Sequence, residues 1–147
     1  MLRPLKSLRL NPVQLSWVAA LFFTTVGNLV LWQSLWAKVE VNSLHSLLFF
    51  LSLPVFLFCF LNLLLAPVLA LPYVRKPVLA MLLIVSASCS YFMYHYQVLI
   101  DRNMVQNFFE TNQAELQSYF SAPLLLTILA LGVLPAGLLV LLPSKKL

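Results

Sequence analysis

The chain has 147 residues, of which 62% are hydrophobic and 9% are charged, and its formal net charge is +5. This composition excludes a soluble domain of useful size. A positive net charge is also common in proteins that bind nucleic acids, but here the basic residues stand in small clusters beside long apolar stretches. Such clusters are typical of membrane topology anchors that contact anionic lipid headgroups, so no nucleic-acid partner is expected.

Four uncharged stretches lie between the charged residues, and each is long enough to cross a bilayer. A hydrocarbon core about 30 Å thick requires roughly 20 helical residues. The sequence therefore predicts an all-α integral membrane protein that forms a single transmembrane domain over residues 1–147. Its four transmembrane helices are expected at about 12–36, 43–66, 77–100 and 122–142.

The first helix has a well-defined start, because Asn11 is a good capping residue and Pro12 suits the first helical position. It is expected to run to about Trp36. Trp17 lies near its inner end, whereas Trp32 and Trp36 lie near its outer end. Tryptophan prefers the headgroup level of a membrane, so these three side chains are interpreted as interfacial anchors.

The second helix is expected to begin after Ser43, which can cap it. Asn62 is a strongly polar side chain deep in this helix. An interhelical hydrogen bond, worth about 0.6 to 2 kcal/mol, explains it better than a ligand contact does. The turn that follows, ALPYVRKP, holds two prolines and two basic residues and is expected to join antiparallel helices on the cytoplasmic side.

The third and fourth helices carry signs of close packing and of bending. Small residues in the third helix permit close contact with a neighbour: Ser86, Ala87, Ser88 and Ser90. Ser121 is the expected cap of the fourth helix. Pro135, together with Gly132 and Gly137, predicts a bend in that helix.

Charge asymmetry predicts the orientation of the four helices. One side of the membrane collects seven of the nine basic residues and no acidic residue, whereas the other side has two basic and four acidic residues. The side rich in lysine and arginine is the cytoplasmic one. Both ends of the chain are therefore expected in the cytoplasm, and the loops near residue 40 and over 101–121 are expected to face outward.

The outward segment 101–121 is too polar to span a membrane but regular enough to form a helix. On a wheel of about 100° per residue, its apolar side chains share one side: Met104, Val105, Phe108, Phe109, Leu116, Tyr119 and Phe120. Four polar residues lie opposite: Gln106, Glu110, Gln113 and Gln117. The segment is predicted to be an amphipathic interfacial helix over about 102–120 on the outer side, with its apolar side in the membrane surface.

Three polar residues of this segment form a stripe along the border of its apolar side. Asn107, Thr111 and Glu115 follow one another at intervals of four residues. An amide, a hydroxyl and a carboxylate at the headgroup level could bind an ammonium group and the phosphate next to it. The alternative is that these side chains are simply solvated, and the spacing alone favours that alternative.

Cysteine and histidine are too sparse to suggest a metal site. Cys59 and Cys89 fall near the middle of predicted helices, so no disulfide is expected. His45 and His95 lie near helix ends. Isolated residues of these types lack the clustered spacing of metal ligands, so no metal or cofactor is predicted in this chain.

The sequence also resembles the phosphoethanolamine transferases that modify lipid A. The resemblance is carried by YHYQVLIDRNMVQNFFETNQAE over residues 94–115, with an I-D-x-x-M core and an N-x-x-x-T-x-x-x-E tail. SLHSLLFFLSLPV over 43–55 and the short basic turn are similar as well. The resemblance covers essentially the whole chain.

The resemblance implies a membrane domain from a two-domain enzyme of the Gram-negative bacterial inner membrane. In that family a zinc-containing periplasmic domain with an alkaline-phosphatase-like fold supplies a threonine nucleophile. It takes phosphoethanolamine from phosphatidylethanolamine, releases diacylglycerol and passes the group to a lipid A phosphate, a modification linked to polymyxin resistance. A fifth span is expected to lead into that domain, so this chain is expected to be a fragment that is not catalytic alone.

The resemblance also assigns roles to residues of this chain. Asn107, Thr111 and Glu115 match positions that bind the donor lipid, and Tyr96 matches a tyrosine near them. No catalytic residue is assigned, and Thr111 is not the nucleophile because no acid or histidine cluster surrounds it. The expected partners are phosphatidylethanolamine, lipid A, surrounding membrane lipids and the enzyme's own catalytic domain, which would carry the zinc.

Two other functions fit the apolar pattern. A small oligomeric membrane transporter is disfavoured because the predicted spans hold no Asp, Glu, Lys or Arg at depth, where proton-coupled carriers usually need one. A structural anchor without lipid selectivity remains the other alternative.

Overall fold

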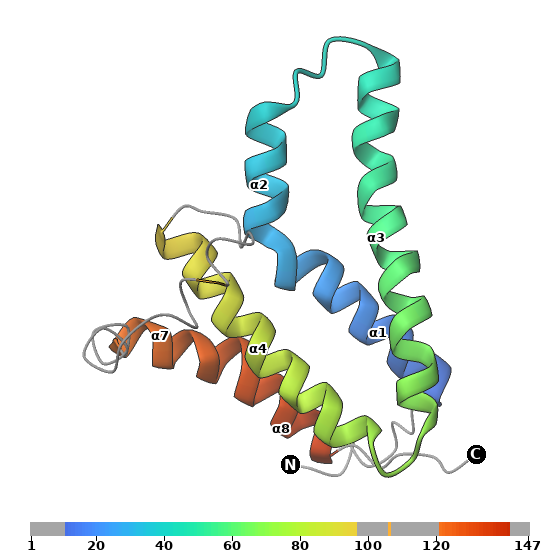
Figure 1. The fold of residues 1–147 in the computed structure, drawn as a ribbon, viewed down its shortest axis with the longest axis vertical. Helices are drawn as coiled ribbons and strands as arrows, with labels where there is room; N and C mark the ends of the chain where they lie inside the picture. Colours follow the sequence, from blue (N-terminus) through green and yellow to red (C-terminus); the bar gives the residue numbers. More distant parts are fainter. Residues whose placement is uncertain (1–10, 97–105, 107–120, 142–147) are drawn as a thin grey trace, which may run out of the picture.

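The computed structural model describes residues 11–96, 106 and 121–141 (Figure 1). Within these residues every regular element is helical. The elements are α1 (Pro12–Thr25), the 3₁₀ turn η2 (Val26–Asn28), α2 (Leu29–Lys38), α3 (Leu44–Ala70), α4 (Arg75–Tyr96), α7 (Ala122–Thr127), the π-helical segment η3 (Ile128–Val133) and α8 (Leu134–Leu141). The predicted all-α class is confirmed.

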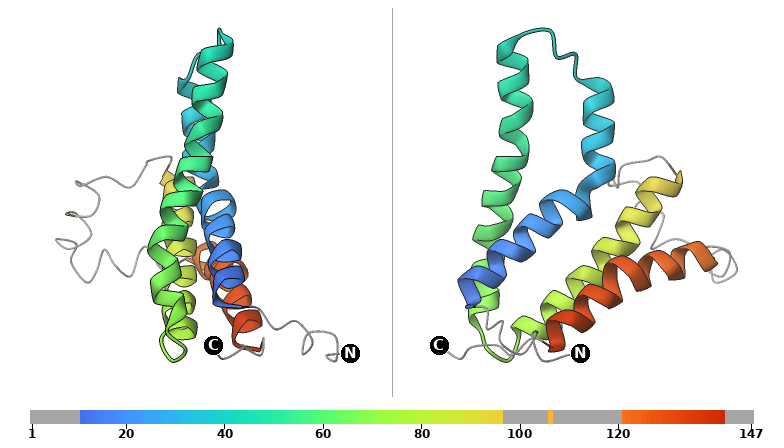
Figure 2. Two further views of the ribbon diagram at one scale, coloured as in Figure 1. Left: turned by 90° about the vertical axis from the view of Figure 1, so that its right-hand side faces the viewer. Right: turned by 180° about the vertical axis from the view of Figure 1, so that it is seen from behind.

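The helices form two packed groups, which come together at one end of the molecule. α1 packs against the second half of α3, and α4 lies along the run of α7, η3 and α8 (Figures 1 and 2). The start of α1, the turn between α3 and α4, and the end of α8 all lie toward the same end of the molecule. At the opposite end, the linker over 39–43 joins α2 to α3 away from the other helices.

Three helical stretches are long and apolar enough to cross a membrane: Pro12–Lys38, Leu44–Ala70 and Arg75–Tyr96. They correspond to the first three predicted spans. The second stretch continues four residues beyond the expected end at 66, because Leu69 is fully buried there and holds the last turn. The described residues also include a shorter apolar helix, Ala122–Leu138, at the place of the fourth predicted span.

The first span is not one straight helix, which the sequence analysis did not predict. Its α-helical pattern is interrupted over Val26–Asn28. Two carbonyl groups near the interruption accept hydrogen bonds from side chains. The Asn28 Nδ2 donates to Phe23 O at 2.8 Å, and the Trp32 Nε1 donates to Thr24 O at 2.6 Å. Trp32 is therefore more than the interfacial anchor predicted for it, because its indole stabilises a bend.

The bend also contacts α4, through Gly27. The Ser90 Oγ donates to Gly27 O at 3.1 Å. A Cβ atom at position 27 would lie 2.8 Å from the Ser86 Oγ, so only glycine fits this approach without a shift. The small residues predicted to permit close helix contact in the third span do so here.

The hydrophobic core lies where α1 crosses α3 and where α4 and α8 approach this pair. Its buried members are Leu15, Ala19, Ala20, Phe23, Leu65, Leu69, Leu79, Leu83 and Ala136. One polar contact crosses it: the Ser16 Oγ donates to the Asn62 Oδ1 at 2.8 Å, and Ser16 is fully buried. This contact confirms the interhelical hydrogen bond predicted for Asn62.

The fourth helix, for which a bend at Pro135 is predicted, has a π-helical segment directly before that proline. The Leu134 N–H donates to Leu129 O, five residues earlier, so the helix widens immediately before the proline. Proline has no N–H and its ring crowds the preceding turn, which explains why the wider helix is found there. Gly132 lies within this segment against α4, where an added Cβ would lie 3.1 Å from the Ile84 Cα and 3.4 Å from the Ala87 Cβ.

We expect Gly132→Ala to lower the free energy of unfolding by about 1–3 kcal/mol, because the new methyl group would crowd the backbone of α4. Gly137→Ala is the matched control, since nothing lies within 4 Å of a Cβ at that position. Alanine is favoured over glycine in a helix by about 1 kcal/mol, so the control should be neutral or stabilising. Thermal unfolding of the two purified variants in detergent measures the difference, and equal shifts would contradict the packing described for Gly132.

Candidate functional site

Four rings follow one another along the last two turns of α4, and we call them the aromatic ladder: Tyr91, Phe92, His95 and Tyr96. The Tyr91 and His95 rings are stacked with centroids 5.3 Å apart, and those of Phe92 and Tyr96 are stacked at 6.0 Å. Edge contacts at 5.7 Å between Tyr91 and Phe92, and at 5.1 Å between His95 and Tyr96, join the two stacks. Rings with polar tips are typical of the level where a membrane meets water.

The aromatic ladder connects to the start of α7 through a pair of hydroxyl groups. The Tyr91 hydroxyl lies 2.9 Å from the Ser121 Oγ, and Tyr91 is only 8% exposed. Ser121 is the N-cap of α7, as predicted, and its Oγ accepts from the Leu124 N–H at 3.4 Å. This contact thus joins the end of α4 to the start of α7. These are the two points in the chain that residues 97–120 connect.

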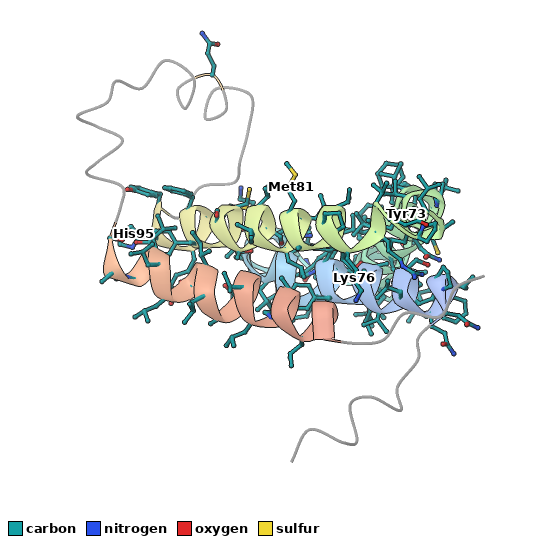
Figure 3. All side chains as sticks on the ribbon, turned by 90° about the horizontal axis from the view of Figure 1, so that it is seen from below. Tyr73, Lys76, Met81 and His95 are labelled. Atoms are coloured by element: carbon teal, nitrogen blue, oxygen red, sulfur yellow. The ribbon has the colours of Figure 1, made fainter. Side chains whose placement is uncertain are left out.

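The ends of α4 differ in chemistry. Figure 3 shows His95 near the end that faces α7, and Lys76 and Tyr73 at the other end. Tyr73 is 89% exposed, and Arg75 and Lys76 begin the helix. The aromatic ladder and the basic turn therefore lie at opposite ends of one apolar helix.

Of the four predicted site residues, the structure places one. Tyr96 is the last residue of α4 and is 45% exposed, within the aromatic ladder. Asn107, Thr111 and Glu115 lie outside the described residues, as does the predicted interfacial helix apart from Gln106. Gln106 is helical and exposed.

Sequence reasoning missed Tyr91 as a member of this site. The sequence pattern gave this residue no site role, and its partner is 30 positions away in the chain. The available signal was local: His95 follows Tyr91 by one helical turn, and Ser121 was already expected to cap the next helix. Nothing in that spacing indicates that a capping serine and a span tyrosine would meet.

The described part of the chain offers no metal site. No group of three His, Cys, Asp or Glu residues gathers there. Cys59 on α3 and Cys89 on α4 are free thiols. These residues do not fit a zinc ion, so no chemical step can be derived from a metal bound to them.

Helical stretches of spanning length, apolar surfaces and a terminal aromatic cluster define a helical membrane protein. A family model described as phosphoethanolamine transferase EptA/EptB matches residues 57–147, and the chain belongs to this family. The matched part contains α4, the aromatic ladder and Ser121, together with the 94–115 motif.

Several curated relatives are similar over most of the chain. Phosphoethanolamine transferase EptA of Escherichia coli strain K12 is 31% identical over 134 residues, which is 91% of this chain and 24% of the relative. Phosphatidylethanolamine transferase Mcr-2 of Escherichia coli is 36% identical over 129 residues, covering 88% of this chain and 23% of the relative. The chain thus spans about a quarter of the length of these relatives. No solved structure matches it.

Proposed function

We propose that this chain is the membrane-embedded part of an enzyme that moves phosphoethanolamine from phosphatidylethanolamine to lipid A, and that it anchors the enzyme and positions the donor lipid. The observation that carries the proposal is the family match over residues 57–147, which includes the N-x-x-x-T-x-x-x-E tail. In this proposal the chain crosses the inner membrane four times. Both of its ends are cytoplasmic, and 102–120 form a periplasmic interfacial helix.

The arrangement of α4 and α7 supports the proposed position of the donor site. Residues 97–120 leave α4 beside the aromatic ladder and return at Ser121, opposite the basic turn. Asn107, Thr111 and Glu115 would therefore stand on the outer side, near Tyr96. A carboxylate and an amide there can hold the ethanolamine ammonium group while the acyl chains stay in the lipid.

The contribution of this chain would be binding and orientation. In the proposed reaction, a threonine outside residues 1–147 attacks the donor phosphorus, the bond to the glycerol oxygen breaks, and diacylglycerol leaves with a proton. A lipid A phosphate oxygen then takes the group from the threonine. Zinc would support this chemistry in a periplasmic domain outside these residues, whereas holding the headgroup in place can lower a barrier by about 7–11 kcal/mol.

The two alternatives make different demands on the chain. A proton-coupled transporter needs ionisable groups at depth, whereas the charged residues of the described helices, Lys38, Arg75 and Lys76, stand at helix ends. A structural anchor would show no preference among lipid headgroups. Binding of phosphatidylethanolamine in preference to phosphatidylcholine, measured in nanodiscs, separates the donor-site proposal from the anchor.

We expect Glu115→Ala to lower the rate of phosphoethanolamine transfer at least about tenfold in the natural full-length protein, because the ammonium group loses its carboxylate partner. Transfer is measured with a labelled donor lipid in proteoliposomes. Glu110→Ala is the matched control, since it removes the same charge from the opposite side of the predicted helix. A wild-type rate for Glu115→Ala, or equal losses in both variants, would count against the stripe.

The proposed orientation is tested by labelling cysteines from outside. In a background with Cys59 and Cys89 replaced by alanine, Asn42→Cys in the exposed 39–43 linker should react with an impermeant maleimide on intact spheroplasts. Tyr73→Cys, in the highly exposed turn at the other end, should react only after the membrane is permeabilised. The reverse pattern would place the ends of the chain in the periplasm.

A further inference from the structure

We infer that Tyr91 is a positioning residue for the transfer reaction, acting through its hydrogen bond with Ser121. The inference rests on the proposed function, because it concerns where the donor-binding segment is held. Tyr91 would not touch the lipid. Its hydroxyl would fix the end of α4 against the start of α7, and with it the two points between which residues 97–120 run.

The hydrogen-bonding capacity of Ser121 suits this role. Its oxygen has two lone pairs and one proton, so it can accept from the Leu124 N–H and still pair with the Tyr91 hydroxyl. Ser121 can therefore make the capping bond and the bond to Tyr91 at the same time. The same oxygen begins α7 and joins α7 to α4, so the direction in which α7 starts is coupled to the position of the Tyr91 ring.

The Tyr91 ring is itself held in place on several sides. It is stacked on His95 with an interplanar angle of 9°, it meets Phe92 edge-on, and it is 8% exposed. The hydrogen bond between Tyr91 and Ser121 is partly buried, so water competes for it less than it would at an open surface. These ring contacts and the low exposure of Tyr91 limit the movement of its hydroxyl, which a positioning contact requires.

Ser90, next to Tyr91, joins α4 to the first span. Ser90 donates to Gly27 O in the bend of the first span, so consecutive residues of α4 bond to two different neighbours. Because of this pair, α4 cannot rotate about its axis without breaking a partly buried hydrogen bond. The end of α4 is thus defined in rotation by Ser90 and in distance from α7 by Tyr91.

Tyr91→Phe is the cleanest test, because it keeps the ring and removes only the hydroxyl. In the natural full-length protein, we expect the KM for donor phosphatidylethanolamine to rise roughly threefold to tenfold, as for a net hydrogen bond, with kcat within about twofold of wild type. The KM is measured in proteoliposomes of varied donor content. Tyr73→Phe removes a hydroxyl from an exposed residue at the other end and should leave both constants unchanged.

Replacements at Ser121 test whether the effect passes through the proposed bond. Thr keeps a hydroxyl and Val has the same shape without one, so Ser121→Thr should retain the wild-type KM and Ser121→Val should raise it. In the Ser121→Val background, Tyr91→Phe should have no further effect, because the partner is already gone. If the bond had only a structural role, Tyr91→Phe and Ser121→Val would instead lower the thermal midpoint and leave the KM unchanged.

The outcomes separate this inference from the proposed function. An unchanged KM in Tyr91→Phe, equal KM values in Ser121→Thr and Ser121→Val, or additive effects of Tyr91→Phe and Ser121→Val would overturn the positioning role. If Glu115→Ala raises the KM while Tyr91→Phe does not, only the positioning role fails. If neither variant alters the KM, the donor-site proposal fails with it.

Discussion

Within the hydrocarbon of a membrane, a backbone carbonyl without a donor costs several kcal/mol, and this constraint governs how the chain can depart from a straight helix. The bend at η2 meets the constraint through side chains. Asn28 and Trp32 donate to carbonyls of the preceding turn, and Ser90 donates from the neighbouring helix. The bend is therefore a stabilised feature of the fold, and it directs α2 and the start of α3 away from α4 (Figure 1).

α4 is the helix on which both irregular segments rest. The 3₁₀ turn approaches it at Gly27 beside Ser86, and the π-helical segment approaches it at Gly132 beside Ala87. Small residues on α4 permit both approaches, because each reduces the distance between backbones. Further along the same helix the side chains become large and aromatic, so the packed middle of α4 supports the ladder at its end.

Sequence reasoning predicted the features that follow from solvent and local chemistry. The first three spans follow from the length of uncharged stretches. The caps at Ser43 and Ser121 follow from hydroxyl chemistry, because each accepts from the backbone three residues later. The polar contact of Asn62 follows from the cost of an unpaired amide in an apolar helix. Each of these predictions requires knowledge of only one helix, or of one polar group inside the membrane.

Contacts between residues far apart in the chain could not be predicted from the sequence in this way. The bend near Gly27 was missed because apolar length predicts a span whether or not the helix is continuous, and glycine is common in spans. Trp32 was assigned to the headgroup level by residue type, although its indole bonds to a carbonyl. Tyr91 and Ser121 are 30 positions apart and meet only when α4 packs against α7. The positions assigned by resemblance, Asn107, Thr111 and Glu115, lie outside the described residues, so the structure leaves them as proposals.

The contact from Ser90 to Gly27 joins residues 63 positions apart, and it has a consequence for biogenesis. When the first span enters the bilayer, the helix that carries Ser90 has not yet been synthesised. The side-chain hydrogen bond to the Gly27 carbonyl can therefore form only after α4 arrives. Completion of the bend is therefore a late event in assembly, and the first hairpin reaches its final shape only after the third apolar stretch has left the ribosome.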